Sequence, residues 1–69
     1  MDLKEIGNMI KERREFLNLR QEDLSEIGNM TNRTIHLIEN GTGNPSFKTL
    51  KKIAEVLGLE INLTIKQVN

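Results

Sequence analysis

The chain has 69 residues, which leaves room for one small domain that buries only about 60% of its unfolded surface. It contains no cysteine, so stability must come from packing or from a partner, and oligomerisation is an expectation. Apolar residues make up 36% of the chain and charged residues 29%, a balance that excludes a disordered tail and predicts a folded globular domain. Ten basic and ten acidic residues cancel, which argues against a protein whose whole surface is basic, the usual pattern of nucleic-acid binders.

The charged residues are unevenly distributed along the chain. Two basic groups flank an acidic one, at Lys11, Arg13, Arg14 and Arg20, at Lys48, Lys51 and Lys52, and at Glu22, Asp23 and Glu26. One basic face on a dipolar molecule would suit a nucleic acid, whereas the simpler interpretation is a solvated helix surface. Both interpretations stay open at this stage.

Membrane, metal and cofactor sites are not expected. No apolar run approaches the roughly 18 residues that a membrane helix needs, and the N-terminus lacks the basic-then-apolar pattern of a signal peptide. With a single histidine and no cluster of histidine with acidic residues, the chain offers no evident metal site. We therefore expect a cytoplasmic protein with no metal, no cofactor and no membrane partner.

The first part of the chain predicts two helices. Residues 3–17 carry apolar side chains at helical spacing, namely Leu3, Ile6, Met9, Ile10, Phe16 and Leu17. Asn18 can end this helix. Residues 21–27 predict a short second helix with two inward side chains, Leu24 and Ile27.

A tight turn and a third helix follow. Gly28 and Asn29 indicate the turn, because both residues tolerate a positive φ at little cost. Thr31 is a suitable N-cap, and Asn40 with Gly41 suits a left-handed end. The inner face of this third helix is expected at Ile35 and Ile38.

A loop over residues 40–45 precedes a fourth helix, for which Ser46 is the predicted N-cap and Gly58 the end. The expected buried face of this helix consists of Phe47, Leu50, Ile53, Ala54 and Leu57.

After Gly58 the apolar period changes from 3.6 to 2, which predicts a strand over residues 59–65. Its apolar positions are Leu59, Ile61, Leu63 and Ile65. No second strand pattern exists in the chain, so the partner of this strand is expected to be another chain. The alternative is a frayed fifth helix packed on the others.

Two short helices joined by a tight turn, with a helix on each side, are the layout that places a second helix in the DNA major groove. Over residues 3–58 the sequence resembles the Cro/CI-type (XRE) helix-turn-helix family. The resemblance lies in Gln21-Glu22-Asp23-Leu24-Ser25, Met30-Thr31, Thr34-Ile35, Ile38-Glu39-Asn40-Gly41 and Asn44-Pro45-Ser46. It implies a mostly α, lambda-repressor-like DNA-binding domain of four to five helices over residues 1–58, and a dimerisation tail over residues 59–69.

The resemblance places base-contacting residues near the start of the third helix. With Ile35 and Ile38 turned inward, helical geometry leaves neighbouring side chains facing outward. Asn can pair with adenine, Arg with guanine, and Leu or a Thr methyl can touch a thymine methyl. The expected base-contacting residues are Thr31, Asn32, Arg33, His36 and Leu37; for each one, an inert surface position is the alternative.

Phosphate contacts are implied at both ends of the motif. Gln21 opens the second helix, where an amide can reach a phosphate beside the backbone N–H groups. Asn40 lies where family members contact the sugar-phosphate backbone, and Arg20, in place of the usual Ser or Thr cap, adds charge there. Lys48 and Lys51 complete the expected phosphate set.

Arg14 and Glu39 occupy positions where family members pair a first-helix arginine with a third-helix carboxylate. The resemblance implies that this pair fixes the orientation of the recognition helix. Its role is expected to be structural.

One alternating strand directly after a compact helix-turn-helix domain resembles the HipB-type antitoxin subgroup, in which the strands of two chains pair across a dimer axis. This resemblance implies a homodimer, autoregulation of an operon and a toxin partner resembling HipA, a Ser/Thr kinase-like protein. The residues themselves show neither an operon nor a toxin.

The sequence therefore predicts a sequence-specific transcriptional repressor that binds double-stranded DNA as a homodimer on a palindromic operator. The alternative is a protein-interaction module that docks a partner protein with little or no DNA binding. An enzyme is not expected, because no Ser, Cys or carboxylate stands at a spacing that would make His36 a base or a ligand.

Overall fold

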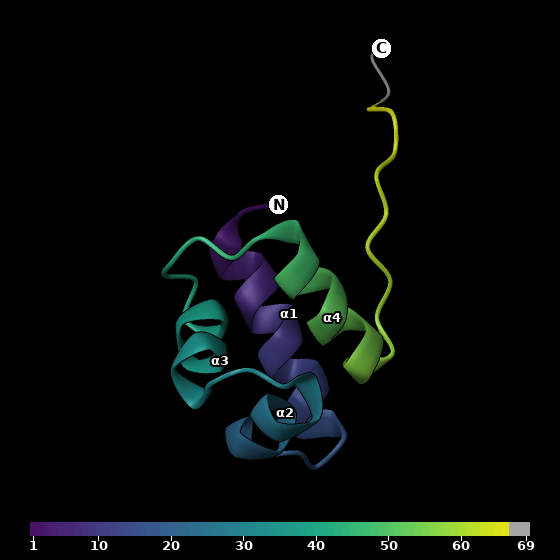
Figure 1. Ribbon diagram of the computed structural model, residues 1–69. Coiled ribbons are helices and arrows are strands. Elements are labelled where there is room, and N and C mark those ends of the chain that lie inside the picture. Colours follow the sequence, from purple (N-terminus) through teal and green to yellow (C-terminus); the bar gives the residue numbers. More distant parts are fainter. Residues whose placement is uncertain (67–69) are drawn as a thin grey trace.

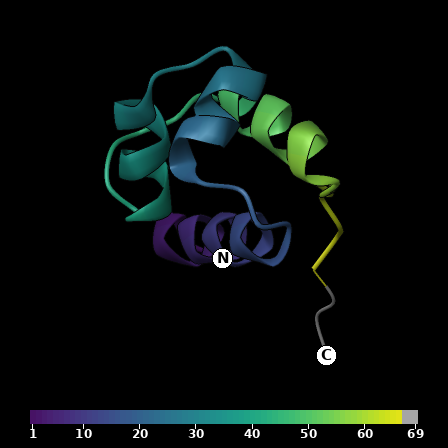
Figure 2. The ribbon, with the colours of Figure 1, turned by 90° about the horizontal axis from the view of Figure 1, so that it is seen from below.

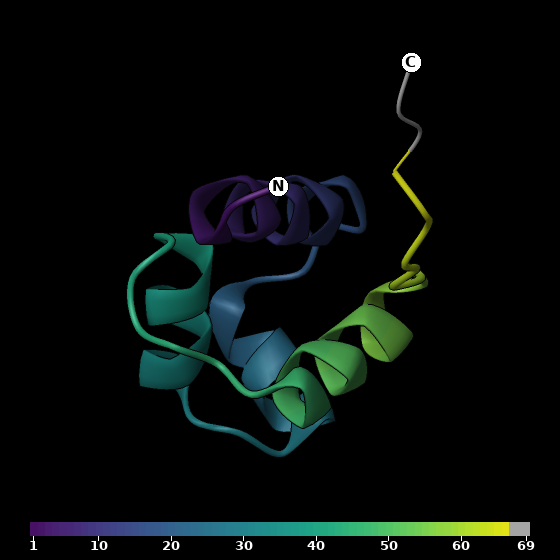
Figure 3. The same ribbon diagram turned by 90° about the horizontal axis from the view of Figure 1, so that it is seen from above.

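The computed structural model describes residues 1–66, and four α-helices lie within that range (Figure 1). They are α1 (Leu3–Phe16), α2 (Gln21–Gly28), α3 (Asn32–Glu39) and α4 (Phe47–Leu57). Figures 2 and 3 show α3 and α4 on opposite sides of the molecule, with α2 between them and α1 running across a third side. Both α3 and α4 pack against α1 and α2. No helix of this described part is long and apolar enough to cross a membrane.

Side-chain caps explain where α3 and α4 begin. The Thr31 hydroxyl accepts a hydrogen bond from the backbone N–H of Thr34 at 3.1 Å, and the Ser46 hydroxyl accepts one from Thr49 at the same distance. Each bond satisfies one of the donors that a helix N-terminus leaves without an intrahelical partner. The N-caps predicted at Thr31 and Ser46 are confirmed.

Left-handed residues end the helices as predicted. Asn18 and Asn29 have φ values of 59° and 53°, and Gly41 and Gly58 follow α3 and α4 with φ values of 73° and 71°. Gly28 differs from the prediction, because it is the last residue of α2 and only Asn29 takes the left-handed conformation.

One hydrophobic core joins the four helices. Its buried members are Ile10 of α1, Leu24 of α2, Ile35 and Ile38 of α3, and Ile53 and Leu57 of α4. Met30, from the turn between α2 and α3, is partly buried against this core. The inner faces predicted for the third helix and for most of the fourth are thereby confirmed.

Two residues that were predicted to lie in the core are exposed, so these predictions are wrong. Ile27 is 58% exposed and Phe47 is 65% exposed. In α2 the buried face runs through Leu24, Ser25 and Gly28, so Ile27 points away from the neighbouring helices. Phe47 occupies the first turn of α4 and lines an open cleft between α4 and α1 instead of the core.

The close approach of α1 to the end of α3 depends on Gly7, which sequence reasoning missed. A Cβ atom at this position would collide with the backbone carbonyl oxygens of Ile38 and Glu39. Helical carbonyl oxygens cannot move aside as a flexible side chain would. Gly7 therefore fixes how α1 packs against the C-terminal end of α3.

Residues 59–66, called the tail below, form neither helix nor strand; the base of the tail lies against α1 and α4, and its far part extends beyond the helices (Figure 1). This excludes the alternative of a fifth helix for these residues; residues 67–69 of the predicted 59–69 tail lie outside the described part. The Leu59 N–H donates to the Ala54 carbonyl oxygen at 2.8 Å, which anchors the base of the tail. The predicted strand is not formed within one chain, and its pairing with a second chain stays a prediction.

Candidate nucleic-acid interface

The two helices of the motif are held together by a small buried residue. Ser25 in α2 is only 7% exposed, and its Oγ lies 2.6 Å from Oδ1 of Asn32, the first residue of α3. The backbone N–H of Met30 donates to the Ser25 carbonyl oxygen at 2.9 Å and closes the turn. A larger side chain would separate the helices, so Ser25 sets the approach of α3 to α2.

The outer face of α3 carries most of the predicted base-contacting residues. Thr31, Arg33 and His36 are exposed, and Leu37 is half-buried. Within the described residues no ion pair involves Arg33, whereas Arg14 and Arg20 are both paired with carboxylates. The guanidinium of Arg33 is thus available to a ligand outside the chain.

Asn32 is placed differently from the other base-contacting candidates. Its side-chain oxygen is engaged with the Ser25 hydroxyl at 2.6 Å. A bidentate contact with adenine uses both the oxygen and the nitrogen of an amide. An amide oxygen has two lone pairs, so the bond with Ser25 orients Asn32 and leaves a second acceptor position for a base.

His36 and Asn40 lie one helical turn apart and touch each other. The amide nitrogen of Asn40 is 3.1 Å from Nε2 of His36, and both residues are exposed. The contact links a predicted base-contacting residue to a predicted phosphate-contacting residue at the C-terminal end of α3.

A buried ion pair anchors the inner end of α3, as the resemblance implied for Arg14 and Glu39. The Arg14 guanidinium donates from Nε to Oε2 of Glu39 at 2.7 Å and from Nη2 to Oε1 at 3.0 Å. Its Nη1 donates to the Leu19 carbonyl oxygen at 2.7 Å, between α1 and α2. The hydrogen bond with Glu39 raises the pKa of Arg14, which favours the charged guanidinium.

Gln21 belongs to the same network, which sequence reasoning missed. Its amide Nε2 donates to Oε1 of Glu39 at 3.2 Å, the oxygen that Arg14 also contacts. A primary amide has two N–H donors, so the second is available to a phosphate. The network thereby orients the residue predicted to contact the sugar-phosphate backbone at the start of α2.

The backbone and the side chain of Arg20 both bond to carboxylates in the first turn of α2. Its backbone N–H donates to Oδ2 of Asp23 at 2.7 Å, and its guanidinium lies 2.6 Å from Oε1 of Glu22 and 3.4 Å from Oδ2 of Asp23. The backbone N–H of Arg20, followed by its guanidinium, lowers the pKa of Asp23, and the bonds with Asp23 raise the pKa of Arg20. Its positive charge is shared with these two carboxylates before any phosphate approaches.

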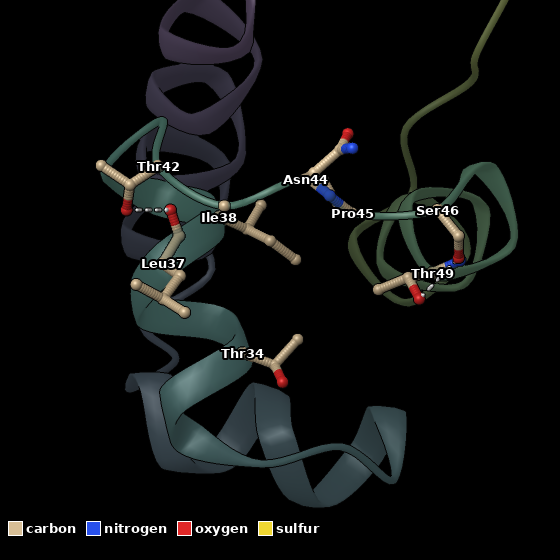
Figure 4. Close-up of a pocket in the computed structure, with 9 residues that line it drawn as sticks. Thr34, Leu37, Ile38, Thr42, Asn44, Pro45, Ser46 and Thr49 are labelled. Carbon is tan, nitrogen blue, oxygen red and sulfur yellow. Dashed lines mark hydrogen bonds between the residues drawn. The ribbon is translucent and has the colours of Figure 1, made fainter.

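An open cavity of about 280 Å³ with a mixed polar and apolar lining separates α3 from the start of α4 (Figure 4). Figure 4 shows Thr34, Leu37 and Ile38 of α3 on one side and Ser46 and Thr49 on the other, with the connecting loop between them. The lining is completed by Thr42, Gly43, Asn44 and Pro45. This hydroxyl-rich surface continues the exposed face of α3 toward α4, a feature that the loop composition alone did not predict.

Lys48 and Lys51, the two phosphate candidates of α4, are both exposed. Lys51 lines a second opening, together with Phe47 and residues of the tail. The side of α4 next to α3 carries Ser46 and Thr49 instead. The structure therefore does not bring Lys51 together with the other phosphate candidates.

Comparison with known proteins identifies the class of this fold and site. A family model described as helix-turn-helix matches residues 10–63. The chain belongs to the helix-turn-helix family of the Cro/CI (XRE) type, a family of transcriptional regulators. The resemblance found in the sequence is confirmed at this level, and its mostly α fold with it.

Individual relatives agree with the family. The ImmF control region 10 kDa protein of Bacillus phage phi105 is 35% identical over 63 residues, covering 91% of this chain and 70% of that protein. An HTH-type transcriptional regulatory protein of Methanothermobacter thermautotrophicus is 34% identical over 59 residues, covering 86% of this chain but only 19% of its own length. Among solved structures, SinR, named as the master regulator for biofilm formation and crystallised in complex with DNA, matches with a TM-score of 0.73. It is 30% identical, and the match covers 80% of this chain and 89% of that one.

Proposed function

We propose that this chain is a transcriptional repressor that binds double-stranded DNA as a homodimer on a palindromic operator. The observation that supports this most directly is the exposed outer face of α3, where Arg33 is unpaired among the described residues and His36 lies beside it. The crystal structure of SinR with DNA, which shares this fold, supports a DNA partner.

In the proposed complex α3 enters the major groove with Arg33, His36 and Leu37 facing base edges. Arg33 is suited to guanine, and Leu37 or the Thr31 methyl group to a thymine methyl. Gln21 and Asn40, at the two ends of the motif, contact phosphates and set the register of the helix on the duplex. Lys48 and the polar loop over residues 40–46 extend this contact toward α4.

The proposed dimer supplies the second half of the site. Two recognition helices that read one face of a duplex must lie about 34 Å apart, one turn of B-DNA. The apolar alternation of the tail supports pairing of two chains there, because a single chain leaves Leu63 and Ile65 exposed. The palindrome follows from the two-fold symmetry of such a dimer.

The test is a gel-shift titration of the full chain on its native upstream DNA, compared with Arg33→Ala and His36→Ala and repeated at several salt concentrations. Each substitution is expected to lower operator affinity by about 1–3 kcal/mol, while weak binding to unrelated DNA persists. Lys11→Ala, which removes an exposed charge from α1, is the control and is expected to leave operator preference unchanged.

A second class of function makes the opposite prediction. A protein-interaction module with little or no DNA binding would show the same affinity for operator and unrelated DNA, and neither substitution on α3 would change it. That result, or a strictly monomeric chain at concentrations that saturate the operator, would contradict the proposal.

A more specific form of this proposal is that the repressor is an antitoxin with a HipA-like kinase partner. It rests on the tail, the feature that resembles the HipB subgroup. It predicts a kinase-like gene adjacent to this one, and co-purification of the two products from cells that express both. The role given to His36 in all of these proposals is binding and not catalysis.

A further inference from the structure

Two apolar surfaces of the chain are exposed: a cleft beside the helices and the apolar side chains of the tail. The cleft, about 340 Å³ in volume, lies between α1, α4 and the base of the tail, and is lined by Met9, Phe47, Leu50 and Ile61 among others. Phe47 is 65% exposed and Ile61 is 44% exposed, so the cleft is open. Farther along the tail, Leu63 and Ile65 are 98% and 95% exposed.

We propose that the tails of two copies pair as antiparallel strands in one register, with Leu63 of each chain opposite Leu63 of the other. This inference rests on the proposed homodimer and specifies its interface. In such a two-fold pair the numbers of facing residues sum to a constant, here 126. Ile61 then faces Ile65 of the second copy, Asn62 faces Thr64, and Glu60 faces Lys66.

Charge complementarity selects this register. Facing side chains in an antiparallel pair point to the same side of the sheet. The apolar tail positions all have odd numbers, so they face one another only when the numbers of facing residues add up to an even value. A centre at Asn62 places Glu60 opposite Thr64, and a centre at Thr64 places Lys66 opposite Asn62. Only the centre at Leu63 forms two Glu60–Lys66 pairs, one on each side of the two-fold axis.

The same register places a side chain of the second copy at the cleft. Because Ile65 of the second copy faces Ile61, its side chain stands at the edge of the cleft that Ile61 lines. The strand places all four apolar tail positions on one side, the side that Leu59 already turns toward the core. Each cleft is therefore closed by the tail of the other chain, and Leu63 packs against its own counterpart on the axis.

Disulfide trapping tests the register directly, because the chain has no cysteine of its own. Facing Cα atoms lie about 4.5–5.5 Å apart, within disulfide reach, whereas residue 61 and its own counterpart would be separated by about 13 Å. Under oxidation with oxidised glutathione, full-length Leu63→Cys is expected to form covalent dimers, and Ile61→Cys alone is not. Mixing Ile61→Cys with Ile65→Cys is expected to restore cross-linking.

Charge reversal gives an independent measurement. Glu60→Lys and Lys66→Glu each place like charges face to face, and each is expected to weaken the dimer by about tenfold in sedimentation equilibrium at low salt. The double variant restores opposite charges and is expected to recover the dimer. Circular dichroism checks that the helices are intact.

Two results would overturn the inference in distinguishable ways. A stable dimer in which Ile61→Cys cross-links to itself, or in which the double reversal does not recover, contradicts the register while the homodimer stands. A chain that stays monomeric while it occupies a full operator contradicts the register and the proposed homodimer together.

Discussion

The carboxylate of Glu39 joins three helices at one point. It is 4% exposed, and its Oε1 atom accepts from both Arg14 of α1 and Gln21 of α2. A buried ion pair is costly to form but more costly to break, because removal of one partner leaves the other charge desolvated. The structural role predicted for this pair therefore extends to the orientation of Gln21 at the start of α2.

Glu39→Gln is expected to lower the free energy of unfolding by about 3–5 kcal/mol, because it leaves the Arg14 guanidinium buried without a counter-charge. Urea denaturation followed by circular dichroism measures the loss. Glu12→Gln, at an exposed position of α1, is the matched control and should change little. If the apolar double variant Arg14→Met with Glu39→Leu were as unstable as the sum of its single variants, the two residues would not be coupled as described.

Gly7 and Gly28 respond differently to the same added methyl group. At Gly7 the new Cβ meets backbone carbonyl oxygens of α3, whereas at Gly28 the nearest atom is the terminal methyl carbon of Met30 at 3.1 Å, which can move. Gly7→Ala is expected to destabilise the chain by about 1–3 kcal/mol through overpacking. Gly28→Ala is expected to be neutral or to stabilise by up to about 1 kcal/mol, because alanine favours the helix. Thermal unfolding of both variants compares them; equal losses would contradict the packing of α1 against α3.

At the scale of elements, α2 depends on a carboxylate at its start. Arg20 has no side-chain oxygen to cap the helix, and Asp23 accepts the Arg20 backbone N–H instead. This bond, with the helix dipole, favours the ionised carboxylate. Asp23 thus supplies the reciprocal bond of a capping box, from three residues farther along the chain, and satisfies one of the N–H groups at the start of α2.

The lowered pKa of Asp23 makes this helix start sensitive to acid. A carboxyl group whose pKa is lower in the folded chain than in the unfolded chain stabilises the fold above its unfolded pKa of about 3.9, and this contribution is lost as pH falls through the folded value. NMR titration should therefore find Asp23 below the usual range. Urea denaturation at pH 7 and below pH 4 should show a smaller loss of stability in acid for Asp23→Asn than for the parent chain. An identical acid loss in both would contradict this role.

The sequence predicts most helix boundaries here because their causes are local. Thr31 and Ser46 cap helices through residues three positions away, and Asn29 needs only its own tolerance of a positive φ. Burial in α2 has a different cause, since Ser25 and Gly28 are buried because they are small enough for α3 to approach. The prediction from hydrophobicity placed Ile27 on that buried face, and this prediction was wrong.

Contacts between distant elements were the least predictable part of the candidate site. The Arg14–Glu39 pair came only from the family resemblance, because the two residues are 25 positions apart. The bond from Gln21 to Glu39 and the collision that keeps residue 7 a glycine depend on how α1, α2 and α3 meet in space. No spacing along the chain encodes such geometry.

At the scale of the whole molecule, a net charge of zero limits the non-specific attraction to DNA. Of the basic residues predicted to contact phosphates, Arg20 is already paired with carboxylates. Each phosphate neutralised by a protein cation contributes a salt-dependence slope of about 0.9, so few free cations imply a shallow slope. In the proposed dimer, affinity for the operator must then come from base contacts and from the presence of two recognition helices on one duplex.

Ending the chain after Glu60 tests the contribution of the second copy. Leu59 and its bond to Ala54 are retained, so the four helices are expected to unfold at nearly the same urea concentration as in the full chain. The truncated chain should be monomeric by light scattering and should bind an isolated half-site as the full chain does. On the full operator it should lose at least about a hundredfold in affinity, because two linked half-sites bind with an avidity that a monomer lacks. Undiminished affinity of the truncated chain for the full operator would show that the dimer forms through the helices and not through the tail.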